Sequence, residues 1–368
     1  MDSTSHFCPN PDCKMSGRIG AGNIGIHSAR EKRLICHRCH KTFAETVGTP
    51  FYRRHHNHQF MAEMLSLLAH GCPVQAIVAT YDLDERTVAA WEKSAGAHCK
   101  AIHQATVQAG QLDLFQVQAD EIRVKAQGRI LWLASAIAVS TRLWLGGVVQ
   151  KSRNTRLVLA LALQVKACAL CRPLFICFDG FAAYLKAFQH AFRSPCPMGQ
   201  RGRPSLGAWP NIILGQVVKQ YERRRVVAVQ RRILQGDEQR ASTLITKSQG
   251  KGVINTAFIE RLNATFREKM NSLVRRGRSL ARTVAKLDAS LYLVGCVYNF
   301  CTWHQSLRLP LYLGTSAQRR WVKRTPAMAA GLTNHQWRIM ELLSYRVWTS
   351  TSEHDKQRIK TIPQFMIT

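Results

Sequence analysis

Three acidic residues constrain this chain more than any other feature, because acids are scarce around them. Between residues 112 and 310 the sequence holds ten Asp and Glu against thirty-one Lys and Arg. Asp120 and Asp179 each end an apolar run, and Glu260 lies in a stretch with helical periodicity. Carboxylates in such basic surroundings form salt bridges unless another role requires them. The pattern predicts two strand ends and one helix that converge on divalent metal held against a polyanion.

The overall charge is consistent with a polyanionic partner. The 368 residues include 52 Lys and Arg against 22 Asp and Glu, which gives a formal net charge of +30. A surface of this kind binds nucleic acid with a steep dependence on salt. A basic protein of membrane surfaces or of the ribosome is the alternative. The length predicts two or three domains, and the sequence shows neither a signal peptide nor an apolar run near the roughly 18 residues of a membrane span, which predicts a cytoplasmic protein.

Two cysteine pairs near the N-terminus predict a zinc ribbon. The first pair has C-x4-C spacing and the second, 22 residues further on, has C-x2-C spacing. The predicted ligands are Cys8, Cys13, Cys36 and Cys39. Four thiolates complete a tetrahedral structural zinc site, and disulfides would be reduced in the cytoplasm. His37 and His40 lie beside the second pair and are alternative ligands.

The next segment predicts three helices, over residues 59–70 and 74–81 and from a cap at Asp84 to about residue 98. Their spacing is typical of a helix-turn-helix. It places Arg86 and Thr87 at the start of a recognition helix, where base edges are usually contacted. A plain three-helix bundle is the alternative.

From residue 112 the pattern alternates as in a mixed α/β domain. We predict strands over 114–120, 130–139, 142–149 and 174–179, with helices over 155–166 and 181–192. Three consecutive strands, a crossover helix and a fourth strand are the order of a ribonuclease-H-like core. Its first and fourth strands lie side by side, so Asp120 and Asp179 should meet. Glu121 should point to the opposite side of the strand, and Glu268 competes with Glu260 because eight residues along a helix return to nearly the same face.

Several segments resemble bacterial insertion-sequence transposases of the DDE type. Segments 118–121, 178–184 and 255–267 are similar to the three acidic motifs of that family, and 298–307 and 325–332 are similar to the stretch that follows its catalytic domain. The third motif is the most specific, because it contains Arg261, Asn263 and Arg267 together with Glu260. This resemblance favours Glu260 over Glu268. It implies two Mg²⁺ or Mn²⁺ ions on Asp120, Asp179 and Glu260.

The chain departs from many relatives of that family by its longer interval between Asp179 and Glu260. The extra residues predict a hairpin, over 212–221 and 226–234, with a basic turn. It is either a DNA-gripping insertion or a fifth strand of the core followed by a long loop. The residues that we expect to contact DNA are basic or polar positions of the recognition helix, of this turn and of the region around and beyond Glu260, namely Arg86, Thr87, Arg223, Arg224, Arg225, Arg261, Asn263, Arg267, Arg275 and Arg276.

The sequence therefore predicts an α/β protein whose ribonuclease-H-like mixed-sheet catalytic core follows a small zinc ribbon and a helix-turn-helix domain. The expected boundaries are 1–50 for the ribbon, 51–111 for the helix-turn-helix, 112–310 for the core with its hairpin insertion near 212–234, and 311–368 for a basic C-terminal tail. The expected function is a metal-dependent transposase that cuts DNA at terminal inverted repeats and joins it to target DNA. It would act as a homo-oligomer at the bacterial nucleoid. A plain nuclease and a DNA-binding regulator derived from a transposase are the alternatives.

Overall fold

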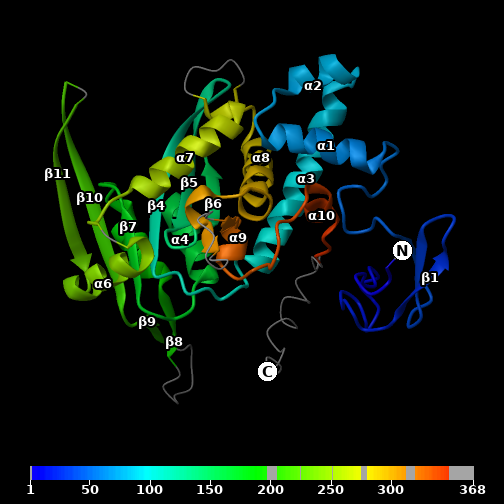
Figure 1. Ribbon diagram of the computed structural model, residues 1–368, viewed down its shortest axis with the longest axis horizontal. Helices are drawn as coiled ribbons and strands as arrows, with labels where there is room; N and C mark the ends of the chain where they lie inside the picture. Colours follow the sequence, from blue (N-terminus) through cyan, green and yellow to red (C-terminus); the bar gives the residue numbers. More distant parts are fainter. Residues whose placement is uncertain are drawn as a thin grey trace. The chain divides into compact units, whose positions relative to one another are not determined.

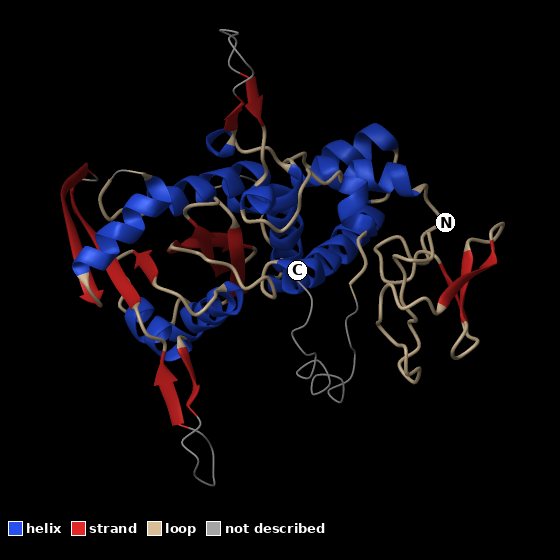
Figure 2. Cartoon of the chain, turned by 60° about the horizontal axis from the view of Figure 1, so that its bottom comes forward, coloured by secondary structure: helices blue, strands red, loops and turns tan. Residues whose placement is uncertain are grey.

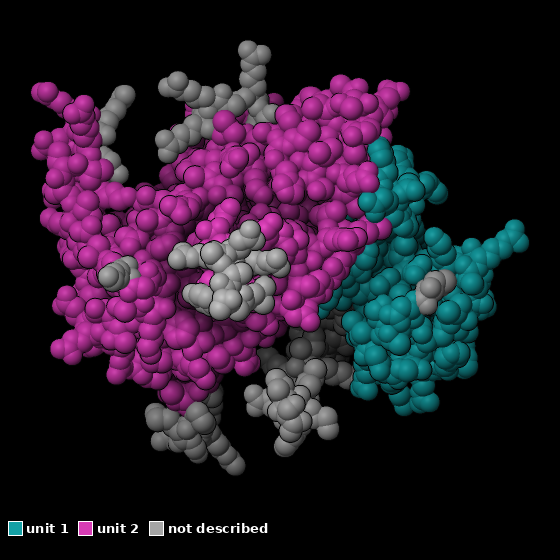
Figure 3. Space-filling view, viewed as in Figure 1, with its two compact units in different colours: residues 1–61, 343–368 teal, residues 62–342 magenta. Residues whose placement is uncertain are grey.

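The computed structural model describes residues 2–196, 205–223, 225–250, 252–274, 280–311 and 320–347. Arg224, Arg275, Arg276 and half of the predicted tail lie outside these residues. The described chain divides into two compact units, one within residues 1–61 and 343–368 and the other within residues 62–342 (Figure 3). Among the described residues, no helix is long and apolar enough to span a membrane.

The first unit is built around a three-stranded antiparallel sheet in the order β1-β2-β3. Its strands are β1 (Ile24–Ser28), β2 (Arg33–Cys36) and β3 (Thr42–Ala44). Its buried cluster is small and consists largely of cysteine, with Ile24, Leu34 and Phe43 beside Cys8, Cys13 and Cys36. Such a small apolar surface stabilises a fold only weakly. A bound metal would therefore supply much of the folding energy.

The second unit contains a six-stranded mixed sheet in the order β11-β10-β7-β4-β5-β6. The strands are β4 (Gln116–Ala126), β5 (Arg129–Ala138), β6 (Trp144–Gln150), β7 (Leu174–Phe178), β10 (Ile212–Glu222) and β11 (Arg225–Gln235). Strands β4, β5 and β6 form an antiparallel meander, β7 runs parallel to β4, and β10 runs parallel to β7. The first and fourth core strands, β4 and β7, therefore lie side by side as expected, and the mixed α/β class is confirmed.

The predicted hairpin forms the edge of this sheet. Strand β10 pairs with β7 and then folds back into antiparallel β11. Between the end of β7 and β10 the chain also forms a smaller hairpin of β8 (Arg193–Cys196) and β9 (Ser205–Ala208). The longer interval before Glu260 thus contains a fifth strand of the sheet, a sixth strand and a helix.

Helices lie on both faces of the sheet (Figures 1 and 2). The larger helices of the chain are α1 (His58–Ala69), α2 (Val74–Tyr81), α3 (Glu85–Thr106), α4 (Thr155–Cys168), α5 (Ala183–Ala191), α6 (Glu238–Gln249), α7 (Ala257–Lys269) and α8 (Val284–Cys296), and α8 continues as a π-helix over Val297–Cys301. Shorter elements are β12 (Leu309–Leu311), β13 (Arg320–Val322), α9 (Pro326–Ala329) and α10 (Ile339–Ser344).

Helix α3 is longer than the sequence pattern predicts. Its second half packs closely along α8, where Gly96 faces the backbone of Ala289: a Cβ at position 96 would lie 2.4 Å from the Ala289 oxygen. Glycine is required at such a close approach of two helices. The helix that carries Arg86 at its start is therefore also part of the compact unit that contains the sheet.

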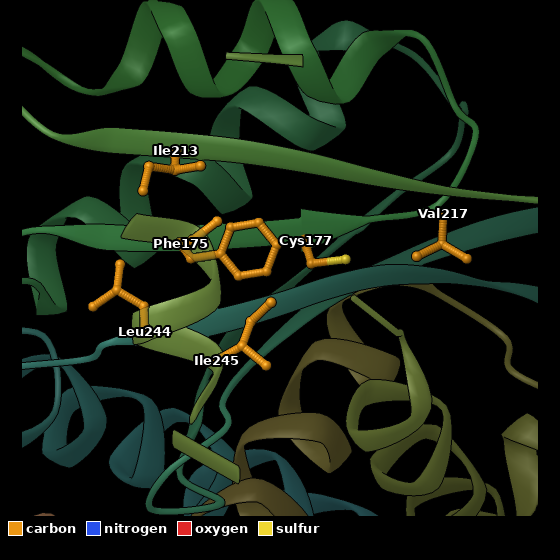
Figure 4. Packing of buried hydrophobic residues seen from close by; sticks show 7 residues of the cluster. Phe175, Cys177, Ile213, Val217, Leu244 and Ile245 are labelled. Carbon is orange, nitrogen blue, oxygen red and sulfur yellow. The ribbon is translucent and has the colours of Figure 1, made fainter. Parts of the chain in front are cut away.

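Helix α6 was not expected from the sequence. Asp237 caps it by accepting a hydrogen bond from the Arg240 backbone N–H. Its apolar face packs Leu244 and Ile245 against Phe175 and Ile213 of the sheet (Figure 4). The acidic cap before apolar residues spaced three and four apart is the signal that identifies it.

Strand β4 also differs from the prediction, which ended it at Asp120. The strand runs on to Ala126, because residues 121–126 pair with 129–134 of β5 across a tight turn. Ile122, Val124 and Ala126 are buried in this extension. Asp120 therefore lies in mid-strand, whereas Asp179 does follow the end of β7 directly.

Candidate metal centres

The four predicted cysteines gather in the first unit. Their sulfur atoms all lie within 4.8 Å of one another. The sulfurs of Cys8 and Cys39 are 3.6 Å apart, and those of Cys13 and Cys36 are 3.9 Å apart. A tetrahedral zinc ion with bonds of about 2.3 Å places its sulfur ligands about 3.8 Å apart, whereas a disulfide needs about 2.05 Å. The arrangement fits one zinc ion, and the group consists of cysteines alone, without His37 or His40.

A neighbouring amide supports the thiolate form of one ligand. The side chain of Asn23 lies 3.2 Å from the sulfur of Cys36 and donates a hydrogen bond to it. Burial raises the pKa of Cys36, but this bond and backbone N–H donors outweigh burial and lower it to about 6. A thiolate is the form that binds zinc.

The second group of candidate ligands lies where β4 passes the end of β7. Oxygen atoms of Asp120, Glu121 and Asp179 all lie within 4.8 Å of one another. Ala119 pairs with Phe178, the last residue of β7, so Asp120 and Asp179 follow side by side on adjacent parallel strands. The sequence prediction that these two carboxylates meet is confirmed.

Glu121 belongs to this acidic group, contrary to the expectation that its side chain points away. Successive residues of a strand do point to opposite faces. Asp120 contacts α7 and Glu121 contacts α5, which places these two helices on opposite faces of the sheet. Because β7 ends at Phe178, however, backbone no longer separates the two faces at this level. Carboxylates from both sides can therefore approach Asp179.

Each carboxylate of the group has defined partners. Asn263 of α7 donates to Asp120 at 2.8 Å, and the hydroxyl of Tyr184 donates to Glu121 at 2.7 Å. Asp179 accepts a hydrogen bond from the Phe181 backbone N–H at 2.9 Å. The group is thus held by both flanking helices and by the turn after β7.

Arg153, in the loop before α4, lies against two of the three acids. Its guanidinium donates to Glu121, and a nitrogen of the same group lies 3.6 Å from an oxygen of Asp179. The guanidinium carbon also lies 4.1 Å from the centre of the Phe181 ring. The sequence offered no signal for Arg153, whereas Tyr184 lies at the end of segment 178–184, which is similar to the second acidic motif, and its bond to Glu121 depends on tertiary structure.

The crowding of negative charge changes the protonation of Asp120. Burial, followed by the neighbouring charges of Glu121, Asp179 and Glu260, raises its pKa to about 7. The pKa of Glu121 is raised as well, and burial is the largest cause. A divalent cation between these oxygens would favour the ionised forms, and hard oxygen ligands of this kind suit Mg²⁺ or Mn²⁺.

Glu260 lies near the acidic group but outside it. Its side chain is 48% exposed and forms an ion pair with Lys219 of β10, and it also accepts a hydrogen bond from Thr256 at 2.8 Å. Its charge acts on Asp120, so the two are close in space. Among the described residues, the structure thus brings together Asp120, Glu121 and Asp179, with Glu260 held beside them.

The positions expected to contact DNA differ in exposure. Arg86, Arg223, Arg225 and Arg261 are exposed, and Thr87 and Arg267 are partly buried. Asn263 is only 1% exposed, and its amide is engaged with Asp120. In this arrangement Asn263 supports the acidic group rather than facing solvent.

Comparisons with known proteins add little to this picture. No family model matches the chain, and no curated protein matches it. A cryo-EM structure of the simian T-cell lymphotropic virus intasome in complex with PP2A regulatory subunit B56 gamma is similar at 14% identity, over 73% of this chain and 74% of that chain, with a TM-score of 0.31. A TM-score at this level does not establish a shared fold. The proposals below rest on the residues themselves.

Proposed function

We propose that this chain is a DDE-type DNA transposase. It binds the terminal inverted repeats of an insertion sequence, cleaves the strands and joins them to target DNA. The observation that carries the proposal is the meeting of Asp120 and Asp179 from adjacent parallel strands, in a chain with a formal net charge of +30. The resemblance of the segments around Asp120, Asp179 and Glu260 to the acidic motifs of these transposases points to the same chemistry.

The strand order supports a ribonuclease-H-like core. Its five strands would be β6, β5, β4, β7 and β10 in spatial order, with an antiparallel meander followed by two parallel strands. In open sheets with parallel strands, sites form beyond the carboxyl ends of those strands. Asp179 lies at such an end, next to Asp120 of the neighbouring strand. In this proposal β11 is an addition to the core.

Asp120, Asp179 and Glu260 are the proposed ligands of two Mg²⁺ or Mn²⁺ ions. Such a pair lowers the pKa of an attacking water or 3′-hydroxyl and stabilises the leaving oxygen of an in-line displacement. Asp120 and Asp179 already face each other, whereas Glu260 must exchange its ion pair with Lys219 for the cation. Lys219 is then placed at the site to contact a DNA phosphate.

The remaining parts of the chain would bind DNA. Arg86 at the start of α3 is exposed at the position expected to contact base edges, and Arg223 and Arg225 at the turn of the hairpin are exposed cations that suit phosphate contacts. The proposed division keeps a zinc ribbon at 1–50, a DNA-binding helical region at 51–111, a catalytic region at 112–310 and a basic tail at 311–368. We further propose that the chain acts as a homo-oligomer at the bacterial nucleoid, with one structural zinc ion per chain.

A joining assay tests the proposal. Purified chain is incubated with Mg²⁺, a labelled DNA fragment that carries one end of the element and an unlabelled target. The transposase proposal predicts labelled product covalently joined to target, and loss of that product in Asp120→Asn with retained binding of the end fragment. Shortened fragments without joining would indicate a nuclease instead. Binding of the end without either product would indicate a regulator.

A further inference from the structure

Gln118 connects the central strand of the sheet to the helix that carries Glu260. It lies two residues before Asp120 on β4, and its side chain is fully buried. Its oxygen accepts hydrogen bonds from the backbone N–H groups of Phe258 at 2.9 Å and Ile259 at 3.1 Å. Its amide nitrogen donates to the backbone oxygen of Asn255 at 2.7 Å. One side chain thus binds both the loop before α7 and the first turn of that helix.

This contact replaces an ordinary helix cap. The first N–H groups of a helix lack partners inside the helix and are usually satisfied by the side chain of the N-cap residue. At α7 the N-cap residue Thr256 makes no such bond, because its hydroxyl donates to Glu260 instead. The Asn255 side chain accepts a hydrogen bond from the backbone N–H of Ala257, and Gln118 accepts from the backbone N–H groups of the next two residues. The cap of α7 therefore comes largely from β4.

A second contact follows at matched spacing. Asp120 accepts from Asn263 on the same face of β4 that carries Gln118. Two residues of a strand span about 6.7 Å. The four to five residues from Phe258 and Ile259 to Asn263 span about 6 to 7.5 Å of helix. Helix α7 is thus attached to β4 at two points, which fix both its height and its rotation relative to Asp120.

We propose that Gln118 is a positioning residue of the acidic site. It holds the first turn of α7 so that Glu260, which directly follows Ile259, starts from a fixed place beside Asp120. This inference rests on the proposed function, since it assigns Glu260 a part in the reaction. It gives a role to Gln118, a residue of the first acidic motif to which neither the charge pattern nor the motif assigned one.

The chain supplies a matched control in Gln116. This residue lies two positions earlier on the same face of β4 and is equally buried. Its oxygen accepts a hydrogen bond from Ser248 of α6 at 2.5 Å. Methionine is nearly the same size as glutamine but has no amide group. Replacing either glutamine by methionine therefore removes a buried amide without a large change in volume. The change at Gln118 removes one of the two attachments of α7 to β4, whereas the change at Gln116 removes an attachment of α6.

The experiment uses the full chain with its zinc. Amide hydrogen exchange is measured without DNA or added Mg²⁺, and joining is measured under steady-state conditions. Gln118→Met is expected to lose protection at Phe258 and Ile259 and to lower kcat at least about tenfold, because a shift of about 1 Å at a site can cost on the order of 10²-fold. The KM for DNA should stay within about twofold, since DNA contacts are unchanged. In Gln118→Glu the carboxylate can still accept from both N–H groups, so this variant should keep more of the protection and of kcat than Gln118→Met does. Gln116→Met should change neither.

Two results would overturn the inference. One is equal loss of kcat in both methionine variants, which would show that β4 needs its buried amides only for stability. The other is unchanged protection at Phe258 and Ile259 in Gln118→Met. A wild-type chain that binds the DNA end but neither cleaves nor joins it would contradict the proposed function. The exchange comparison would then still decide whether Gln118 holds α7.

Discussion

Lys219 of the edge hairpin forms an ion pair with Glu260 of α7. The pair joins the basic hairpin to the helix that flanks Asp120, and Glu260 lies beside the group of Asp120, Glu121 and Asp179 rather than within it. Glu260, the third proposed acid, therefore has a cationic partner, whereas Asp120 and Asp179 lie together.

Glu260→Gln should abolish joining, and Glu268→Gln should reduce it at most about twofold. Glu268 is exposed and lies eight residues further along α7, about 12 Å at 1.5 Å per residue, so it cannot replace Glu260 at the acids. Both variants keep the length of the side chain and remove one charge from the same helix. Joining rates under single-turnover conditions provide the comparison. The reverse order of effects would mean that the third acid has been misassigned.

Arg153→Gln should strengthen binding of Mn²⁺. The guanidinium of Arg153 occupies the acidic group by pairing with Glu121 and lying near Asp179, so a cation must compete with it. Its removal should lower the Kd for Mn²⁺ at least about threefold in calorimetry, a gain of roughly 0.7 kcal/mol. Arg156→Gln removes an equal charge from an exposed position three residues later and should leave the Kd almost unchanged. Weaker binding in Arg153→Gln would show that Arg153 organises the acids rather than competing for them.

Asp120→Asn should stabilise the fold at alkaline pH when Mg²⁺ is absent. Burial, with the neighbouring acids, raises the folded-state pKa of Asp120 to about 7 from an ordinary value near 3.9. The ionised form is therefore disfavoured in the native state, and stability is lost as pH rises from about 4 to about 7 and regained as pH falls. The variant should unfold at a higher temperature than wild type at pH 8, with a difference that shrinks toward pH 4.

Thermal melts in buffer without chelator, so that zinc is retained, measure this difference. Addition of Mg²⁺ should raise the Tm of wild type but not of Asp120→Asn, because a ligand stabilises only the form that binds it. A variant that is less stable than wild type at pH 8 would show that the stronger hydrogen bond from Asn263 to an ionised carboxylate, compared with an amide oxygen, outweighs the cost of the buried charge.

Removal of one zinc ligand should unfold the first unit. The purified chain is expected to hold about one zinc ion, and Cys39→Ser should lower both the zinc content and the stability of residues 2–61. Cys196→Ser changes an exposed cysteine of β8 and should leave the zinc content unchanged. Metal analysis with exchange measurements on the two variants checks this. Full zinc occupancy in Cys39→Ser would exclude the four-cysteine site.

The sequence was informative where the signal was local or repeated. Paired cysteines at short spacing predicted the zinc ligands, and the succession of three strands, a helix and a fourth strand predicted that Asp120 and Asp179 meet. Both follow from rules that need only a short stretch of chain. The sulfur–sulfur distances between the cysteines match a tetrahedral site, and the register of β4 and β7 places Asp120 beside Asp179.

What the sequence could not predict depends on where elements end and on what packs across them. The alternation of side chains along β4 led to the exclusion of Glu121. The alternation holds, but β7 stops at Phe178, so carboxylates from both faces of the sheet approach Asp179. Arg153 reaches Glu121 and Asp179 from the loop before α4, and Tyr184 reaches Glu121 across 63 residues of sequence. The capping of α7 by Gln118 spans about 140 residues of sequence, a separation over which no local pattern carries information.

The measurement that tests the central claim most directly is a Mn²⁺ titration of the zinc-loaded chain without DNA, for wild type, Asp120→Asn and Asp179→Asn. In the proposed function, these two aspartates from neighbouring strands form one divalent-cation site. The proposal predicts that each substitution raises the Kd for Mn²⁺ at least about tenfold, or roughly 1.4 kcal/mol, while zinc content stays constant. Equal Mn²⁺ affinity in wild type and in both variants would contradict it.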